Sequence, residues 1–583
     1  MASFSLSRTL LLVLSAVGSV SAGVDKWLSP QYKWTYQFPL PTPPVKAPSK
    51  TIINPVTGKN MLYYEVEIKE FKSQVYPDRG PATLWGYDGI SPGPTFIVEK
   101  GTETVVRFIN NARLANSVHL HGSYSRAPFD GWAEDITPPG WYKDYYYPNS
   151  QSARTLWYHD HAIDHTAENA YYGQAGAYIL HDPSIEDPLN LPSGYGIHDI
   201  PLILSAKQYN PDGSLFSPEA ETTSLYGDII HVNGQPWPFL RVEPRKYRFR
   251  FLDASISRSF LLSLERDTKV GSKLSFDVIA SDAGLLTAPQ RVTELYLSMA
   301  ERYEVVVDFG AYAGENITLK NAREVGADRD YPDSDKVMRF IVSPDPVDDP
   351  AQRSNGEWKI NGVSFADVAN RVLARPKRGT VEVWELENSS GGWTHPIHIH
   401  LVDFRVKKRV SGKRSVLPYE AQGLKDVVWL GPGETVTVEA HYAPWDGVYM
   451  FHCHNLIHED HEMMAAFNVS VLQDLGYDET QYIDPMEERW RARKESVEAF
   501  EDGKIEERVK EMAGYRPYDK VAEVESVLEE YWETKTKAVT TTTTTAQVVP
   551  TSAGVIITTS FKTSTTSSSS STKTSSTSTK KRD

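Results

Sequence analysis

The stretch His452-Cys453-His454-Asn455-Leu456-Ile457-His458, followed by Met463, brings three kinds of metal-binding side chain into one short run. Cys453 is the only cysteine of the chain, so no intramolecular disulfide is possible. Residues i and i+2 of a β-strand project from the same face. His452 and His454 are therefore expected to point one way and Cys453 the other. The pattern predicts two metal sites, joined by the short covalent path from one thiolate to two imidazoles.

Three further histidine clusters precede this stretch. They are His119-Leu120-His121, His159-Asp160-His161 and His395-Pro396-Ile397-His398-Ile399-His400, and the four clusters together hold ten of the 16 histidines. A single His-x-His pair arises easily by chance, whereas four clusters, one of them with the only cysteine, indicate a metal centre. Each pair on a strand aims two imidazoles at one place, so four pairs can enclose several metal ions. Imidazole is a natural ligand for copper, iron and zinc.

The thiolate side of the pattern can be completed by nearby residues. Cys453, His458 and Met463, with His395 from the third cluster, supply two nitrogens, one thiolate and one thioether. That ligand set is typical of a blue-copper electron-transfer site. Zinc more often uses additional cysteines or carboxylates in a closed tetrahedral site. Copper is therefore the favoured metal.

The chain between about 51 and 475 has an all-β pattern, in which short β-branched and aromatic segments alternate with Gly, Pro, Asn and Asp turns. Examples of such segments are Met61–Ile68, Thr104–Ile109 and Thr435–Ala440. Weak internal repetition of turn sequences, at a spacing of roughly 120–140 residues, suggests three similar β-domains with boundaries near 190 and 350. Chance turn chemistry is the alternative explanation. The turns are Gly93-Pro94-Thr95, Gly234-Gln235-Pro236 and Asn361-Gly362-Val363.

The two ends of the chain differ from its middle. Arg8, an apolar stretch and Val20-Ser21-Ala22 have the features of a signal peptide at 1–22, with 23–50 as an N-terminal segment or propeptide. Charged stretches predict a helical extension at 481–539. The Thr/Ser-rich residues 540–583 cannot bury a core and are expected to form a disordered tail.

Composition limits the partners and the location. The net charge of −15 argues against nucleic acid and anionic membrane surfaces as partners. No apolar run reaches the ~20 residues that a membrane span needs. We therefore expect a secreted protein, extracellular or associated with a cell wall, and most simply a monomer. Sequons at Asn316, Asn388 and Asn468 are compatible with glycosylation.

In their order and spacing, the four histidine motifs resemble those of the multicopper oxidases. The likeness covers nearly all of residues 50–480, and the surrounding sequence is most similar to that of fungal bilirubin oxidases and laccase-like enzymes, for example at Gly131–Asp135 and His458–Met464. This resemblance implies three cupredoxin-like Greek-key β-barrel domains, with a copper cluster between the first and the third. The corresponding boundaries are 51–190, 191–350 and 351–480.

The resemblance also implies four copper ions and a ligand set for each. The type 1 copper would be held by His395, Cys453, His458 and Met463. The type 2 copper would be held by His119 and His398. The type 3 pair would be held by His121, His159, His161, His400, His452 and His454.

Three further residues are candidates for catalysis by their position. Asp130, downstream of the first histidine pair, and Glu459, next to His458, could supply the protons that reduction of O₂ requires. The alternative for each is a solvated acid in a turn. Trp393, two residues before His395, could form part of the substrate-side wall, or it could be a packed core tryptophan.

The expected reaction is one-electron oxidation of a small organic reducing substrate, phenolic or tetrapyrrole-type, coupled to four-electron reduction of O₂ to water. A dedicated phenol-coupling enzyme of fungal secondary metabolite or pigment biosynthesis would use the same chemistry. Among metallo-oxidases, a Cu(I) oxidase is disfavoured because the chain has only nine methionines and no methionine-rich insertion. An Fe(II) oxidase would need carboxylates near the type 1 copper, which the sequence does not locate. A non-catalytic copper electron-transfer protein would need only the type 1 ligands, and the complete histidine set argues against it.

Overall fold

The computed structural model describes residues 27–322, 331–343, 365, 371–388, 393–460, 463–472, 482–519 and 521–536, and the backbone of 555–561. The predicted signal peptide at 1–22 lies outside the described residues, as does the turn Asn361-Gly362-Val363. Strands dominate, which confirms the predicted all-β class. Among the helices of the described part, none is long and apolar enough to cross a membrane.

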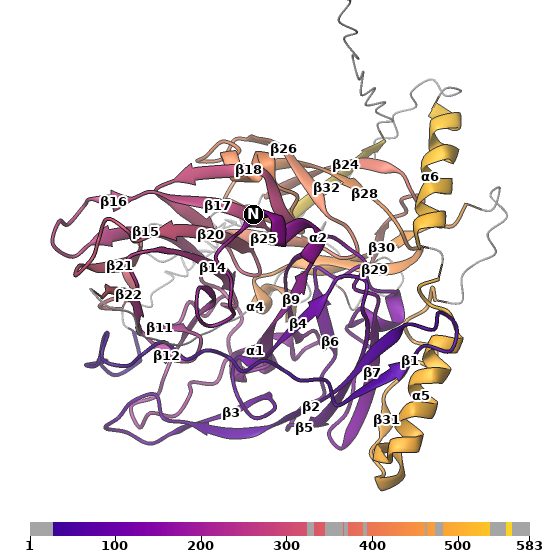
Figure 1. Cartoon of the computed structure of the whole chain (residues 1–583), viewed down its shortest axis with the longest axis horizontal. Coiled ribbons are helices and arrows are strands. Elements are labelled where there is room, and N and C mark those ends of the chain that lie inside the picture. The colour runs from indigo at the N-terminus through magenta and orange to yellow at the C-terminus, as the bar shows by residue number, and fades with distance from the viewer. Residues whose placement is uncertain are drawn as a thin grey trace, which may run out of the picture.

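Two β-sheets, here called the first sheet pair, are built mainly from the N-terminal part of the chain (Figure 1). The first two histidine clusters lie at strands of one of these sheets. One has the order β1-β2-β5-β7-β31 with β3 paired to β2, and the other the order β4-β9-β8-β6. The strands are β1 (Lys50–Ile53), β2 (Asn60–Ser73), β3 (Ala82–Tyr87), β4 (Gly93–Glu99), β5 (Glu103–Asn111), β6 (Val118–His121), β7 (Trp141–Tyr147), β8 (Arg154–Asp160), β9 (Ala175–His181) and β31 (Arg493–Lys494).

The second sheet pair follows in the chain. Its sheets have the orders β12-β11-β10-β14-β20-β17-β18 and β13-β22-β21-β15-β16, with β19 paired to β15. The strands are β10 (Asp199–Lys207), β11 (Ile229–Val232), β12 (Gln235–Pro236), β13 (Phe239–Val242), β14 (Lys246–Asp253), β15 (Phe260–Arg266), β16 (Lys273–Leu274), β17 (Phe276–Ser281), β18 (Gly284–Val292), β19 (Leu295–Leu297), β20 (Arg302–Asp308), β21 (Asn316–Asn321) and β22 (Lys336–Val342).

The third sheet pair contains the last two histidine clusters. Its sheets have the orders β23-β30-β29-β25-β27 and β26-β28-β24-β32. The strands are β23 (Val372–Ala374), β24 (Val381–Asn388), β25 (His395–Ile399), β26 (Phe404–Val410), β27 (Val427–Leu430), β28 (Thr435–His441), β29 (Gly447–Cys453), β30 (Met464–Val469) and β32 (Val555–Phe561).

Short helices connect the strands. They are η1 (Ala127–Phe129), α1 (Thr166–Tyr172), α2 (Pro183–Glu186), η2 (Asp187–Leu189), α3 (Pro418–Gln422) and α4 (Leu456–Asp460). The extension after the third sheet pair adds η4 (Val497–Phe500), α5 (Asp502–Gly514) and α6 (Val521–Thr536).

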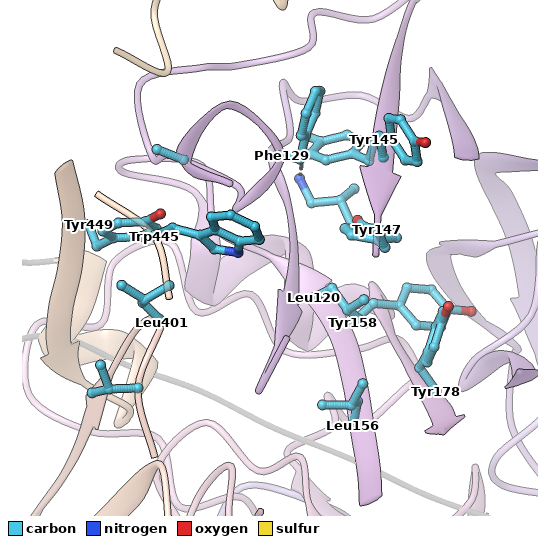
Figure 2. Close-up of a cluster of buried hydrophobic side chains, with 14 of the residues drawn as sticks. Leu120, Phe129, Tyr145, Tyr147, Leu156, Tyr158, Tyr178, Leu401, Trp445 and Tyr449 are labelled. Carbon is cyan, nitrogen blue, oxygen red and sulfur yellow. Dashed lines mark hydrogen bonds between the residues drawn. The ribbon is translucent and has the colours of Figure 1, made fainter. Parts of the chain in front are cut away.

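The first and third sheet pairs share one hydrophobic core. A single cluster contains Leu120 and Tyr158 from the first pair and Leu401 and Trp445 from the third (Figure 2). Leu120 stands between His119 and His121, so its burial in this core follows the period-2 alternation of a strand. The shared core therefore holds the histidine clusters of the two sheet pairs next to each other.

The segment before β1 packs on the second sheet pair. Tyr32 and Leu40 are buried in its core, and Pro39 forms a bridge with Phe239. Whether residues 23–50 are a propeptide stays a prediction.

The C-terminal extension contains the helices α5 and α6, and α5 contributes to a hydrophobic core. Ile505, Val509 and Met512 of α5 belong to the core shared by the first and third sheet pairs. Strand β31 pairs with β7, and α5 runs along β1 (Figure 1). The apolar positions at i, i+4 and i+7 form the stripe with which a helix packs on a core.

The predicted disorder of 540–583 is wrong for one segment. Residues 555–561 form β32, which pairs antiparallel with β24 from Glu382↔Phe561 to Asn388↔Val555. The reason is local, because Val555, Ile556 and Ile557 are β-branched residues within the Thr/Ser-rich stretch and favour a strand. The rest of the predicted tail lies outside the described residues.

Candidate metal centre

Strand pairing brings the four histidine clusters together in two sets. In β6 and β8, His119 lies directly opposite His159. In β25 and β29, His398 lies opposite His452, and Cys453 lies opposite Ile397. Each His-x-His pair therefore projects from the end of a strand, as the alternation predicts.

Eight histidines converge on one buried pocket between the first and third sheet pairs. Their side chains are almost completely inaccessible to solvent. The ring centroids of His119 and His400 lie 4.1 Å apart, and those of His121 and His398 lie 3.8 Å apart. The eight are His119, His121, His159, His161, His398, His400, His452 and His454.

The nitrogens of this pocket fit metal ions. Seven of the eight histidines, all but His452, have a buried ring nitrogen without a hydrogen-bond partner, such as Nε2 of His119 and Nδ1 of His121. Nε2 of His161 and Nε2 of His452 face each other at 3.1 Å. Burial lowers the pKa of His119 and His161 to about 3, so the rings are neutral and keep a free lone pair. Neutral imidazoles aimed at a common centre are the donor set that copper takes.

The opposite ring nitrogens are fixed by two aspartates. His119 Nδ1 lies 2.5 Å from the Asp130 carbonyl oxygen, and His400 Nδ1 lies 2.8 Å from Asp130 Oδ2. His398 Nδ1 lies 2.8 Å from the carbonyl oxygen of Asp426, and His121 Nε2 lies 3.2 Å from Asp426 Oδ1. Such partners determine which nitrogen of a ligand faces the metal.

Both predicted proton donors lie at this pocket, buried and not in a solvated turn. Asp130 follows η1 and contacts His119 and His400 as described. In α4, Glu459 places Oε2 2.8 Å from His452 Nδ1 and Oε1 3.3 Å from His161 Nδ1. Burial raises the pKa of Asp130 well above its ordinary range and that of Glu459 to about 7.

Asp426 and its partner Arg302 also belong to the site, although neither was predicted from the sequence. Asp426 precedes β27, and Arg302 begins β20 of the second sheet pair. Burial acts to raise the pKa of the Asp426 carboxyl, but the Arg302 guanidinium outweighs it and holds that pKa at about 2. No motif signals this pair, because its two members come from different parts of the chain.

Cys453 belongs to a second set of ligand atoms on the other face of β29. Its Sγ lies 3.4 Å from His395 Nδ1 and 3.6 Å from His458 Nδ1, and the two Nδ1 atoms are 3.1 Å apart. The Cys453 N–H donates to the Met463 carbonyl, and the Met463 N–H donates to the His458 carbonyl. These two hydrogen bonds bring the backbone of Met463 back to that of Cys453. His452 and His454, which flank Cys453, belong to the histidine pocket.

Trp393 lies beside this second set. Its ring centroid is 6.3 Å from that of His458, at an interplanar angle of 89°. Asn388 holds it in place by donating to the Trp393 carbonyl at 2.7 Å. Asn388 is itself buried, so the sequon at this position is not accessible for glycosylation in the folded protein.

The side of His458 that faces away from Cys453 contacts the second sheet pair. His458 Nε2 lies 3.3 Å from Ser224 Oγ, in the loop before β11, and 3.0 Å from Asn455 Nδ2. Ser224, Asn455 and Trp393 therefore surround the outer edge of the His458 ring.

Comparison with known proteins identifies the group to which this geometry belongs. Models of multicopper oxidase domains match residues 71–185 and 343–473. A bilirubin oxidase from Albifimbria verrucaria is 59% identical over 529 residues, which cover 84% of this chain and 92% of that protein. The chain belongs to the multicopper oxidase family. It is an oxidoreductase that binds copper and passes electrons from a reducing substrate to O₂.

Other relatives of this multicopper oxidase extend the same result to bacteria. A laccase from Bacillus subtilis (strain 168) is 34% identical over 498 residues, covering 71% of this chain and 95% of that protein. The crystal structure of McoA multicopper oxidase from Aquifex aeolicus matches with a TM-score of 0.62 at 27% identity, covering 74% of this chain and 100% of that one. The predicted cupredoxin-like architecture is thereby confirmed.

Proposed function

We propose that this multicopper oxidase is secreted and uses four copper ions to couple one-electron oxidation of phenolic or tetrapyrrole-type donors to four-electron reduction of O₂ to water. One observation carries the proposal: a buried pocket of eight histidines is joined through Cys453 to a separate thiolate set. An electron-transfer protein would need only the thiolate set.

The proposed ligands are those that the motifs imply. The thiolate set of His395, Cys453, His458 and Met463 would hold the type 1 copper, and His119 and His398 would hold the type 2 copper. When bound, the copper ions supply the one-electron steps and the site of O₂ reduction. The type 3 pair would be held by His121, His159, His161, His400, His452 and His454.

The protein's own residues prepare the pocket for this chemistry. Backbone carbonyls and carboxylates accept hydrogen bonds from one nitrogen of His119, His398 and His400 and leave the other nitrogen free. Burial keeps solvent away from reactive oxygen species. The covalent path from Cys453 to His452 and His454 joins the two sites without any intervening side chain.

Two carboxyl groups would hold and donate the protons that reduction of O₂ requires. Glu459 can hold a proton at Oε2, 2.8 Å from His452 Nδ1, and Asp130 can hold one at Oδ1, which has no hydrogen-bond partner. Both lie at the wall of the pocket where O₂ would be reduced, which is the position that a proton donor needs.

The donor would meet the protein at the side chains that cover the outer edge of the buried His458. Trp393 offers an aromatic wall there, and Ser224 and Asn455 offer polar groups. A small aromatic donor suits such a surface because it can stack while it gives up an electron. The identity to a bilirubin oxidase supports a tetrapyrrole among the accepted donors.

Oxygen uptake by the copper-loaded protein tests this function. The donors are bilirubin, a simple phenol, a dihydroxynaphthalene-type polyketide, Fe(II) and Cu(I). Rapid uptake with the organic donors and little with the metal ions is expected. A strong preference for the polyketide would identify a dedicated phenol-coupling enzyme, and uptake with metal ions alone would contradict the proposal.

Secretion is part of the same proposal. Support comes from the signal-peptide features of residues 1–22 and from the single cysteine, which ligation would protect from oxidation. Sequencing the N-terminus of protein recovered from culture medium checks it, and a monomer is expected in light scattering.

A further inference from the structure

The second sheet pair supplies none of the proposed copper ligands, yet one of its side chains binds a residue that contacts the histidine pocket. Arg302 is completely buried at the start of β20. Its Nε donates to the Thr155 carbonyl of the first sheet pair at 3.0 Å. Its Nη1 and Nη2 donate to Asp426 Oδ1 and Oδ2, next to β27 of the third sheet pair, at 2.8 and 2.7 Å. One guanidinium therefore joins all three sheet pairs.

Asp426 connects this guanidinium to two proposed ligands. Its carboxylate oxygen Oδ1 faces His121 Nε2, and its backbone carbonyl accepts from His398 Nδ1. Arg302 occupies both carboxylate oxygens, so the carboxylate has one orientation and presents Oδ1 to His121. A bidentate pair fixes geometry in a way that a single hydrogen bond does not.

The neighbouring contacts of Arg302 hold it in the same orientation. Nη1 also donates to the Ala300 carbonyl at 3.0 Å, and Nη2 lies 3.3 Å from the Asp282 carbonyl. The backbone N–H of Arg302 donates to Asp282 Oδ1 at 2.7 Å. Next to Asp426, Lys425 is bound to Asp282 Oδ2 at 2.8 Å. The backbone N–H of Asp426 donates to the same Oδ2 at 3.3 Å, so Arg302 and Asp426 are fixed to one carboxylate of the second sheet pair.

The glycine that follows His121 leaves room for this pair. A Cβ on Gly122 would lie 2.6 Å from Arg302 Nη2 and 2.8 Å from Asp426 Oδ2, closer than side chains approach. Gly122 also has φ +85°, a conformation that favours glycine. The His-Leu-His-Gly sequence of the first cluster is therefore built around the Arg302–Asp426 pair.

We propose that Arg302 is a positioning residue for the copper cluster: it acts through Asp426 to orient His398 and His121. The inference rests on the proposed function, because it assigns these histidines to the type 2 copper and the adjacent type 3 copper. The second sheet pair then has a direct role in copper binding, beyond separating the other two.

The test compares Arg302→Lys, Asp426→Asn and the double variant as copper-loaded full-length proteins. Lysine keeps the charge but cannot make the bidentate pair. Losing such an outer partner weakens metal affinity by about 10–100-fold. We therefore expect loss of the type 2 electron paramagnetic resonance signal and of bound copper, with the blue absorption of the thiolate set retained.

Arg250→Lys is the matched control. Arg250 is also buried and also makes a bidentate pair, with Asp199, and it donates to Thr155 Oγ1. In the described part of the chain, its hydrogen bonds go to Asp199, Thr155 and Glu304, and Asp426 is not among them. It should lose thermal stability to a similar degree while keeping the type 2 signal.

The double variant decides whether Arg302 acts through Asp426. If it does, the double variant loses no more type 2 copper than Asp426→Asn alone. Additive losses, an unchanged type 2 signal in Arg302→Lys, or an equal loss in the control would each overturn the inference. If Arg302→Lys does not fold, an unchanged type 2 signal in Asp426→Asn would also overturn it. Failure of the unmodified protein to bind type 2 copper would instead contradict the proposed function.

Discussion

At the scale of single residues, the two faces of one strand separate two kinds of site. Cys453 faces His395 and His458, while His452 and His454 on either side of it face the histidine pocket. This division follows from strand geometry alone, so it was predictable from the sequence. The chemistry of the protein depends on it, because one backbone segment belongs to both sites.

Replacing the thiolate tests the first site. Cys453→Ser should abolish the blue absorption and turnover, because a hydroxyl does not replace a thiolate as a ligand for copper. The fold should remain, since Cys453 is one of many side chains in the large shared core and serine differs from it by a single atom. Absorption and circular dichroism spectra measure both, and a retained blue band with copper bound would contradict the assignment.

Replacing the thioether tests the axial position. Met463→Leu should raise the type 1 reduction potential, because loss of a thioether donor destabilises the oxidised ion more than the reduced one. Met464→Leu is the matched control: Met464 begins β30 and packs in a separate hydrophobic cluster. A redox titration followed by the blue absorption measures the potentials. An unchanged or lower potential for Met463→Leu would count against an axial Met463.

The sequence predicted the ligand types better than their surroundings. His119 and His398 are visible in motifs, whereas Asp426, which orients one of them, precedes an ordinary strand. Its importance comes from the tertiary contact with Arg302, which no local pattern encodes. Asp130 and Glu459 were predicted by position, but their burial against histidines became visible only in the fold.

At the scale of elements, strands were easier to predict than the ends of the chain. The segments Met61–Ile68 and Thr435–Ala440 lie within β2 and β28, because β-branched and aromatic alternation is strong there. The segment that forms β32 is short and surrounded by Thr and Ser. The composition of that region therefore predicted a disordered tail and no strand. In α5 the many charged residues likewise gave no indication that an apolar stripe of the helix packs into the core.

The role of α5 in the core can be measured. Met512→Ala removes a completely buried side chain and should lower the free energy of unfolding by about 2–5 kcal/mol. Lys510→Ala, on the exposed side of the same helix, should change it by less than about 0.5 kcal/mol. Denaturant unfolding provides the comparison. Equal effects of the two substitutions would mean that α5 does not belong to the core.

At the scale of the whole molecule, a buried carboxylate lies where the first and second sheet pairs meet. Glu304 of β20 accepts from Arg250 of β14 at 2.8 Å and from Thr155 of β8 at 2.7 Å. Burial acts to raise the pKa of the Glu304 carboxyl, but Arg248 and Arg250 outweigh it and hold that pKa at about 2. The contact between the first and second sheet pairs therefore includes an ionised carboxylate.

This carboxylate should make the structure sensitive to acid. Because the folded pKa lies below the ordinary value of 4.5, the stabilisation is complete above pH 4.5 and is lost as pH falls toward 2. This stabilisation of the folded state amounts to about 3 kcal/mol.

Glu304→Gln should lower the free energy of unfolding at neutral pH, and the difference from the unmodified protein should shrink between pH 4.5 and 2. Thermal unfolding across this pH range measures the difference in stability. The surface variant Glu439→Gln is the control. A difference that is independent of pH would contradict the ionised pair.

We propose that the histidine pocket and the thiolate set act together as one oxidase. The most direct test is to count electrons per O₂ in the copper-loaded protein, with an electrode for O₂ and an assay for hydrogen peroxide during oxidation of a phenol. We expect four donor electrons for each O₂ and no peroxide. Two electrons for each O₂ with peroxide released, or no O₂ uptake by protein that holds its copper, would contradict it.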